Sequence, residues 1–288
     1  IHKSKIDRVS KHIATKEFIE IIISNGRKIT VTPEHPVFCI ENAKITTKRA
    51  DQITKDDWIP VPLNLPIPGE VQQFNTPQEN VFISRASQHI AVPIHNDKNF
   101  FKIVGYILAE GSKELNRGKL IGINFTNKDP ILLEDFKKSM NSIFNIKPYI
   151  QARIDDHDPR YMLRYISREL AEFLRNEVPE LLKTSGYKEI PSLCMKGKRE
   201  DLAAMLCCMF EGDGHVSKKQ RTIRIGYGSK SRRMCEQVQD ILLRFGIRSN
   251  LREHKKSYKV SITGYKNVLL FKDHIGFISK NKSRIMED

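Results

Sequence analysis

Two acidic residues, Glu110 and Asp213, each close an apolar run of small or aliphatic residues, and each is followed by glycine. The runs occupy residues 103–111 and 206–214. An acid at the end of a buried helix is costly unless it meets a cation or another partner. Because the chain carries a formal net charge of +15, the two acids indicate a metal site held against a polyanion.

The segments that follow the two acids have matching patterns. Residues 120–126 and 222–228 alternate between apolar and small or polar side chains, which is typical of strands with one buried face. Amphipathic helices, further strands and a closing helix follow in the same order; they are expected at 129–144, 149–154, 161–166 and 167–175 in the first half, and at 231–245, 248–253, 258–262 and 265–274 in the second. The helix expected at 129–144 ends next to Asn145, and the helix expected at 231–245 ends next to Gly246. Both residues suit a helix C-cap. We therefore predict an α+β fold with an internal duplication of type αββαββα.

At these residues the chain resembles the LAGLIDADG homing endonucleases in their monomeric form with two fused repeats. The resemblance covers about 98–288, with repeats at about 98–180 and 199–288. The ending Glu211-Gly212-Asp213-Gly214 fits the family motif well. The first motif departs from it, because Glu110 stands where Asp is commoner.

This resemblance implies an arrangement in which the two motif helices pack side by side as the domain interface. Small residues would let the backbones approach; the candidates are Gly105, Ala109, Cys207, Cys208 and Gly212. The resemblance further implies that Glu110 and Asp213, with Gly111 and Gly214, bind Mg²⁺, for which Mn²⁺ can substitute. The implied activity is that of a monomeric, site-specific double-strand DNA endonuclease that leaves a staggered break. Two metals that share carboxylates suit such a phosphodiester displacement.

Lysines are the third expected part of the site. The segment 186–191 resembles the Lys-x-Ile-Pro block that precedes the second motif in intein endonucleases, and this places Lys188 near one centre, where it would stabilise developing charge. For the second half we favour Lys255, with Lys256 and Lys259 as rivals. Most lysines of a basic protein contact only solvent or phosphate, so that interpretation stays open for each.

A basic face for nucleic acid is indicated by the distribution of charge. Residues 1–96 hold 12 basic and 10 acidic side chains, and the remaining 37 basic and 24 acidic side chains lie in 97–288. The strand alternation puts Arg224 opposite Ile223 and Ile225, so the polar face is free to lie in a major groove. The candidates for DNA contact are Asn124, Thr126, Arg164, Arg224, Lys230 and Lys259.

The amino-terminal part, 1–97, is expected to be a small, mostly β module that includes a Pro-rich linker at 60–97. Its Asn25-Gly26 pair is a hairpin signal. Thr32 and His35 form a Thr-x-x-His block that resembles inteins and hedgehog-type (Hint) autoprocessing domains, in which these residues promote an acyl shift. With Ile and Asp at its two ends, the chain shows no junction nucleophile. The module is therefore expected to be a partial, non-splicing one.

Other functions remain open at this stage. The chain could be a maturase-like RNA chaperone, a non-cleaving DNA binder or a fragment of a splicing intein, and the acids could merely cap or pair within two core helices. Five cysteines without a Cys-x-x-Cys pair indicate a reducing, intracellular setting, in the cytoplasm or nucleoid. No apolar run reaches a membrane-spanning length.

Overall fold

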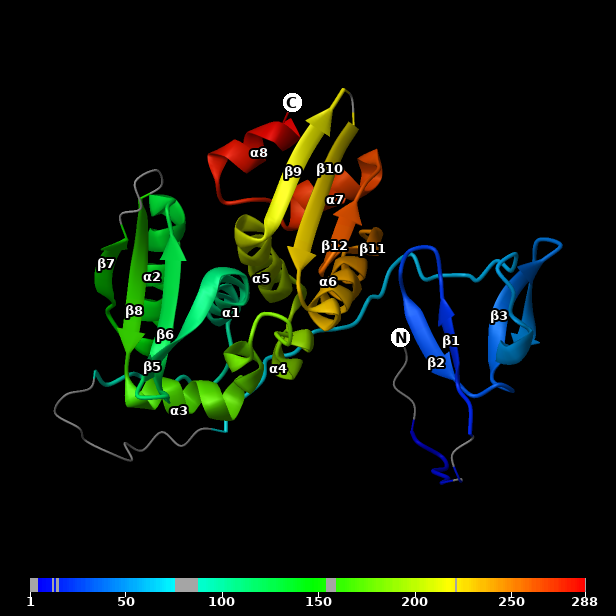
Figure 1. Cartoon of the computed structure of the whole chain (residues 1–288), viewed down its shortest axis with the longest axis horizontal. Coiled ribbons are helices and arrows are strands. Elements are labelled where there is room, and N and C mark those ends of the chain that lie inside the picture. The colour runs from blue at the N-terminus through cyan, green and yellow to red at the C-terminus, as the bar shows by residue number, and fades with distance from the viewer. Residues whose placement is uncertain are drawn as a thin grey trace.

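The computed structural model describes residues 5–11, 13, 16–75, 88–153, 159–220 and 222–287 (Figure 1). Its amino-terminal part holds two antiparallel ribbons. They are formed by β1 (Ile19–Ile22) with β2 (Lys28–Val31), and by β3 (Pro36–Glu41) with β4 (Lys44–Arg49), followed by the short 3₁₀ helix η1 (Ala50–Gln52). The turn between β1 and β2 contains Gly26 at φ 84°, so the predicted hairpin turn is confirmed.

The first repeat has the predicted αββαββα order. Its elements are α1 (Lys98–Glu110), β5 (Gly111–Asn116), β6 (Lys119–Asn127), α2 (Pro130–Phe144), β7 (Tyr149–Arg153), β8 (Arg160–Ile166) and α3 (Arg168–Glu177). The strands form an antiparallel sheet in the order β5-β6-β8-β7. Asn145 caps α2 in the left-handed region at φ 48°, as its position in the sequence predicted.

The second repeat has the same order after a short connection through η2 (Pro179–Leu182) and α4 (Ser192–Met195). Its elements are α5 (Arg199–Gly212), β9 (Gly214–Lys219), β10 (Thr222–Ser229), α6 (Arg232–Arg244), β11 (Ser249–His254), β12 (Ser257–Ile262) and α7 (Tyr265–His274). Its sheet runs β9-β10-β12-β11, which matches the first sheet strand for strand. A last helix, α8 (Lys280–Glu287), follows the repeat and contacts β9.

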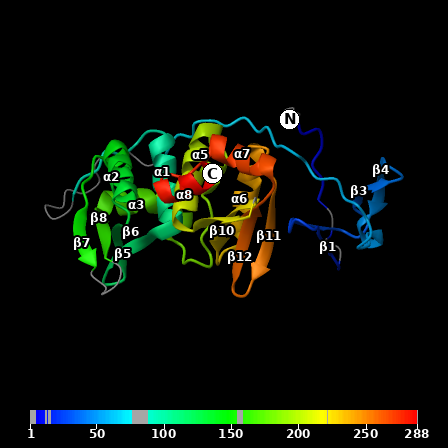
Figure 2. The same ribbon diagram turned by 90° about the horizontal axis from the view of Figure 1, so that it is seen from above.

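The two motif helices, α1 and α5, lie side by side between the two sheets (Figures 1 and 2). α2 and α3 pack on the first sheet, while α6 and α7 pack on the second. α1 is buried at Phe100, Phe101 and 103–108, while Lys102 stays partly exposed and pairs with Asp135. Ile225 and Tyr227 of β10 are fully buried and Arg224 is exposed, as the predicted alternation requires, whereas Gly226 is buried as well.

Small residues set the distance between α1 and α5. A Cβ atom added at Gly105 would lie 2.4 Å from the Met205 carbonyl oxygen and 2.9 Å from the Cys208 Cβ. One added at Gly212 would lie 2.6 Å from the Ala109 Cβ. Real Cβ contacts are longer than this, so larger side chains at either glycine would force the helices apart.

The β1–β2 ribbon docks on the second repeat, on its outer side (Figure 2). The Asn25 carbonyl oxygen accepts hydrogen bonds from the Leu251 amide at 2.9 Å and from Gln239 Nε2 at 3.0 Å. Arg27 pairs with Asp240 at 2.5 Å. The turn of the ribbon is therefore fixed to α6 and β11 by backbone and side-chain contacts.

The Pro-rich segment after the ribbons has no regular helix or strand in its described residues, 60–75 and 88–97. It runs along α6, where the Leu65 amide donates to the Leu243 carbonyl and Arg244 donates to the Ile67 carbonyl. Among the described helices none is long and apolar enough to cross a membrane.

Candidate functional site

The two predicted acids lie at corresponding helix ends. Glu110 is the last residue of α1, and Asp213 is the C-cap of α5. Asp213 keeps a solvent-exposed surface, yet the protein packed around it raises the pKa of its carboxyl to about 6. Burial is the largest cause and the negative charge of Glu110 adds to it, while Lys188 and Lys282 oppose the rise. The negative charge of Glu110 is therefore close enough to Asp213 to disfavour its ionisation.

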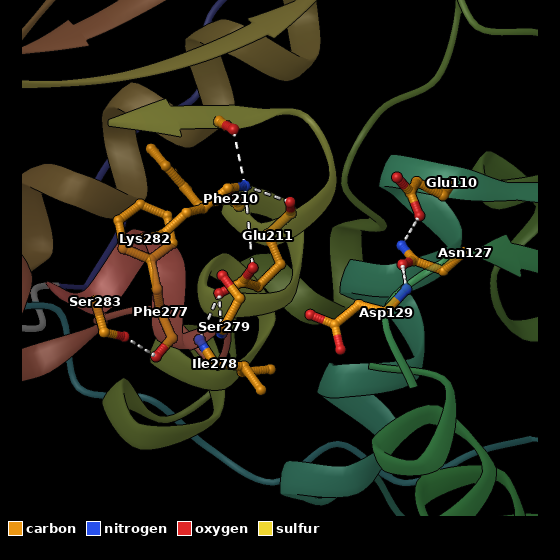
Figure 3. A network of polar contacts seen from close by, with 11 residues as sticks. Glu110, Asn127, Asp129, Phe210, Glu211, Phe277, Ile278, Ser279, Lys282 and Ser283 are labelled. Carbon is orange, nitrogen blue, oxygen red and sulfur yellow. Dashed lines mark hydrogen bonds and ion pairs between the residues drawn. The ribbon is translucent and has the colours of Figure 1, made fainter. Parts of the chain in front are cut away.

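Glu110 is held by a side chain that the sequence analysis did not identify. Asn127 at the end of β6 donates a hydrogen bond to Glu110 Oε2, and its own Oδ1 accepts from the Asp129 amide at 2.8 Å (Figure 3). Burial raises the pKa of Glu110, although Asn127 and the positive charge of Lys282 lower it. A signal for Asn127 was present, because it lies two residues before the N-cap Asp129, as Ser229 lies two residues before the N-cap Ser231.

Lys188 lies at the end of α1 that carries Glu110. Its Nζ donates to the carbonyl oxygens of Ile107 at 2.8 Å, Leu108 at 3.2 Å and Gly111 at 3.1 Å. The Leu108 carbonyl lies in the last turn of α1, where a carbonyl lacks a helical amide, and the Ile107 carbonyl also accepts from the Gly111 amide. The ammonium therefore supplies further donors at the negative end of the helix dipole. The side chain is 9% exposed, and this burial lowers the pKa of its amine against the opposing charge of Asp213.

The corresponding lysine at the end of α5 is Lys282, on α8 (Figure 3). Its Nζ donates to the carbonyl oxygens of Phe210 at 3.0 Å, Glu211 at 2.5 Å and Gly214 at 2.9 Å. Burial lowers the pKa of the Lys282 amine, and the charges of Glu211, Glu110 and Asp213 oppose that change.

The expectation that Lys255 fills this place therefore needs correction. Lys255 is exposed in the turn between β11 and β12, at φ 56°. Of its rivals, Lys256 is exposed in the same turn and Lys259 is half-buried within β12. The register places this turn at the same end of the second sheet as Gly214, because Tyr258 pairs with Ser229 and Tyr227 pairs with Gly214. Lys255 is nevertheless exposed there, whereas α8 contacts β9 and brings Lys282 to the carbonyls at the end of α5.

The donors at this site fit a hard divalent cation. The described residues contain no group of three or more His, Cys, Asp or Glu side chains that could hold a metal unaided. The charge of Glu110 raises the pKa of Asp213, and these two carboxylates, with glycine carbonyls beside them, instead form a partial set of oxygen ligands. Mg²⁺ is commonly held by one or two carboxylates together with water and phosphate oxygens. Gly111 and Gly214 were predicted to lie beside the metal. The Gly111 carbonyl accepts a hydrogen bond from Lys188 and the Gly214 carbonyl accepts one from Lys282, so each lysine would lie next to the bound cation.

Comparison with known proteins assigns the fold. A family model described as a LAGLIDADG-like domain matches residues 99–179 and 200–276, which together make up more than half of the chain and coincide with the two repeats. The chain belongs to the LAGLIDADG family. The solved structure of the homing endonuclease I-WcaI bound to its DNA recognition sequence is similar in fold, with a TM-score of 0.50, 14% sequence identity and coverage of 65% of this chain and 85% of that one.

Two curated proteins contain segments similar to this LAGLIDADG chain. The glutamine–fructose-6-phosphate aminotransferase of Methanocaldococcus jannaschii is 26% identical over 216 residues, covering 71% of this chain and 19% of that protein. The replication factor C small subunit of Pyrococcus horikoshii is 27% identical over 271 residues, covering 93% of this chain and 26% of that protein. The chain thus spans about a fifth to a quarter of the length of these relatives.

The polar face of the first LAGLIDADG sheet is already internally paired. Glu114 accepts from Arg164 at 2.7 Å and from Asn124, and these bonds lower the pKa of the Glu114 carboxyl. Asn124 is 7% exposed and its Oδ1 has no partner among the described residues. Thr126 lies further along the same strand and is half-buried. Arg164 and Asn124 would have to leave or share Glu114 to contact another molecule.

The polar face of the second sheet carries more free positive charge. Arg224 is exposed on β10, and Lys259 is half-buried on β12. His215 on β9 lies against Gly226, where an added Cβ would lie 2.2 Å from its ring. This histidine was not among the residues predicted for the site; burial and the charges of Lys259, Lys282 and Arg224 lower its pKa. Lys230 is exposed in the loop between β10 and α6.

Thr32 and His35 lie in the turn between β2 and β3, away from the acids. The His35 amide donates to the Thr32 carbonyl at 3.1 Å, and the Ala50 amide donates to the His35 carbonyl at 2.9 Å. The hydroxyl of Thr32 bonds Glu34 and lowers the pKa of that exposed carboxyl. The His35 side chain is exposed. The block is thus a tightly bonded turn.

Proposed function

We propose that this chain is a divalent-metal-dependent, site-specific endonuclease that cuts both strands of a DNA duplex and leaves a staggered break. The observation that carries the proposal is that the two halves of the site match. Each motif helix ends in an acid, and a separate lysine donates hydrogen bonds to carbonyls at the end of each helix. Two such centres, one for each half of the fold, suit a substrate with two strands.

The residues have distinct roles in this proposal. Glu110 and Asp213 would hold Mg²⁺, or Mn²⁺ in its place, with the carbonyls of Gly111 and Gly214 beside them. When bound, the metal would polarise the scissile phosphate and activate a water molecule. Lys188 and Lys282 would stabilise negative charge that develops on the phosphate, because each places an ammonium at a fixed point beside an acid.

DNA would lie along the polar faces of the two sheets. Arg224, Lys230 and Lys259 would contact the duplex from the second sheet, while Asn124, Thr126 and Arg164 would do so from the first. The two halves carry different side chains at matching positions, so a single chain would bind two different half-sites as a monomer. This agrees with the excess of basic residues in 97–288.

The chain would be an insert within a longer host protein, with the amino-terminal ribbons as a partial Hint-like module. The supporting observation is that similar segments occur in an aminotransferase and in a replication factor C subunit, two proteins whose names share no activity. An element that moves between genes would account for such hosts. An endonuclease that cuts the empty site would provide a means of moving.

The test is cleavage of a plasmid library that carries a randomised insert, with Mg²⁺ or with a chelator, followed by sequencing of the ends. We expect a shared target sequence and staggered ends that require the metal. The Asp213→Asn variant should bind the selected duplex as wild type does but fail to cut it, because it loses a ligand and keeps the basic surface. Cleavage by this variant at the wild-type rate would refute the site assignment. Tight binding without cleavage by the wild type would instead indicate a non-cleaving binder.

A further inference from the structure

Reciprocal bonds join the end of α5 to α8 and to the segment just before it (Figure 3). Lys282 of α8 donates to three carbonyls at the end of α5. In return, Glu211 Oε1 of α5 accepts from the amides of Ile278 at 2.5 Å and Ser279 at 2.9 Å. The carboxylate thereby holds the backbone a few residues before the lysine.

Because it is buried, the Glu211 carboxylate depends on hydrogen bonds and a nearby positive charge. The Glu211 side chain is 1% exposed, and its Oε2 lies 3.9 Å from Lys282 Nζ. A buried carboxylate is costly unless hydrogen bonds and a nearby cation compensate it. The amides of residues 278 and 279 and the ammonium of Lys282 provide that compensation, so Glu211 is stable only while this segment and this lysine stay in place.

The first repeat secures its lysine differently. The residue that corresponds to Glu211, counted from the motif acid, is Leu108, which is apolar and 1% exposed. The Lys188 segment is held by Gln237 of α6, which accepts from the Ile190 amide and donates to the Ile190 carbonyl, both at 2.8 Å. The two lysines make equivalent bonds but depend on different anchors.

From this difference we propose that Glu211 is the positioning residue for Lys282, and that it aligns one of the two centres only. The inference rests on the proposed nuclease function for its kinetic consequence, but the alignment itself is independent of it. Apolar contacts also attach this segment, since Phe277 packs on Phe271 at 5.4 Å and Met286 is 8% exposed. Loss of the Glu211 carboxylate should therefore shift Lys282 without detaching α8.

The kinetic experiment uses the full chain and the duplex selected from the library, with a different end label on each strand. Glu211→Leu copies the residue of the first repeat, and Glu211→Gln keeps an acceptor of the same size if the first variant folds poorly. Hydrogen bonds to a charged group correspond to roughly a ten- to hundredfold change, so Glu211→Leu should slow one strand by that factor and Glu211→Gln by less. DNA affinity should be unchanged.

A double-mutant cycle separates positioning from a general loss of structure. If Glu211 acts through Lys282, adding Glu211→Leu to Lys282→Met should slow cleavage less than about twofold further. Ser283→Ala is the matched control. Ser283 lies on α8 beside Lys282, and the change removes its hydrogen bond to the Phe277 carbonyl while leaving Glu211 intact. Additive effects in the cycle, or equal slowing of both strands, would overturn the proposal.

A second readout needs no catalysis. Acetylation of lysines by a water-soluble anhydride, read by mass spectrometry, should modify Lys282 several times faster in Glu211→Leu than in wild type. Lys188 serves as the internal control and should not change. If wild type cuts no DNA but Lys282 still becomes reactive, the nuclease proposal fails and the positioning role stands. Unchanged reactivity of Lys282 would refute the positioning role whatever the enzyme does.

Discussion

Replacing Gly105 by alanine should test whether the spacing of α1 and α5 sets the site. In an ordinary helix this change stabilises the protein by about 1 kcal/mol. Here the added Cβ would lie 2.4 Å from the Met205 carbonyl oxygen, which belongs to the backbone and cannot rotate away. The helices would therefore have to separate by about 1 Å to reach ordinary contact distances.

The expected change in stability of Gly105→Ala is the balance between this steric overlap and the gain in helix propensity. Overpacking of a tight core costs about 1–3 kcal/mol, and contact with backbone places Gly105→Ala toward the upper end of that range. After the gain in helix propensity, the net loss should be about 1–2 kcal/mol. For a chain of this size that corresponds to a fall in Tm of about 2–8 °C.

Activity should fall as well, because Gly105 lies five residues from Glu110, or about 7.5 Å along the helix. A displacement of about 1 Å at catalytic groups can cost about a hundredfold in rate. We expect kcat for the selected duplex to fall by roughly ten- to a hundredfold at temperatures well below Tm, with DNA affinity nearly unchanged.

The matched control is Gly186→Ala. Nothing lies within 4 Å of a Cβ added at Gly186, so its effect on stability should stay within about 0.5 kcal/mol. Thermal unfolding and cleavage of both variants would be measured side by side. If Gly105→Ala unfolds at or above the wild-type temperature and cuts normally, close helix approach does not set this site.

Three further predictions concern the lysine, the acid and the docked ribbon. Lys282→Met should slow one strand by about tenfold or more, whereas Lys255→Met should cut like wild type; the reverse result in strand-specific time courses would restore the sequence-based choice. Mg²⁺ affinity should fall as pH decreases through about 6, because the raised pKa of Asp213 leaves its carboxyl protonated and unable to bind metal below that pH; calorimetric titration at pH 7.5 and 5.5 tests this, and a profile that Asp213→Asn does not flatten would contradict it. Asp240→Ala should cost under about 1 kcal/mol, since its pair with Arg27 is partly exposed, yet should speed hydrogen exchange in the β1–β2 ribbon; unchanged exchange would show that the backbone bonds alone hold the ribbon.

The repeats could be predicted from sequence because their buried residues leave a periodic pattern. Ile223, Ile225 and Tyr227 are spaced two residues apart on β10, and α1 carries an unbroken apolar run from Ile103 to Ala109. The strands β5 and β9 escaped individual prediction. They lie at sheet edges and are mostly exposed, so burial imposes no clear alternation on them.

The missed site residues are held by contacts that periodicity does not encode. Lys282 lies beyond the last predicted helix, in a charged segment that ends the second repeat. A comparison of the repeats could have found it, since Lys188 follows the N-cap Ser167 by 21 residues and Lys282 follows the N-cap Gly264 by 18. Asn127 could be seen only as a position before a helix cap, because its bond to Glu110 joins two separate elements.

The placement of the lysines explains how a duplicated fold can have two unequal centres. Each repeat supplies its helix and its acid, and the close approach at Gly105 and Gly212 fixes how far apart the helix ends lie. The lysines come from segments that follow the repeats, one in the connection before α4 and one in α8. These segments lie outside the two αββαββα units, and each has its own polar anchor, Gln237 for the first and Glu211 for the second. Inequality between the centres therefore arises from the connections, while the paired helices preserve the symmetry that both acids require.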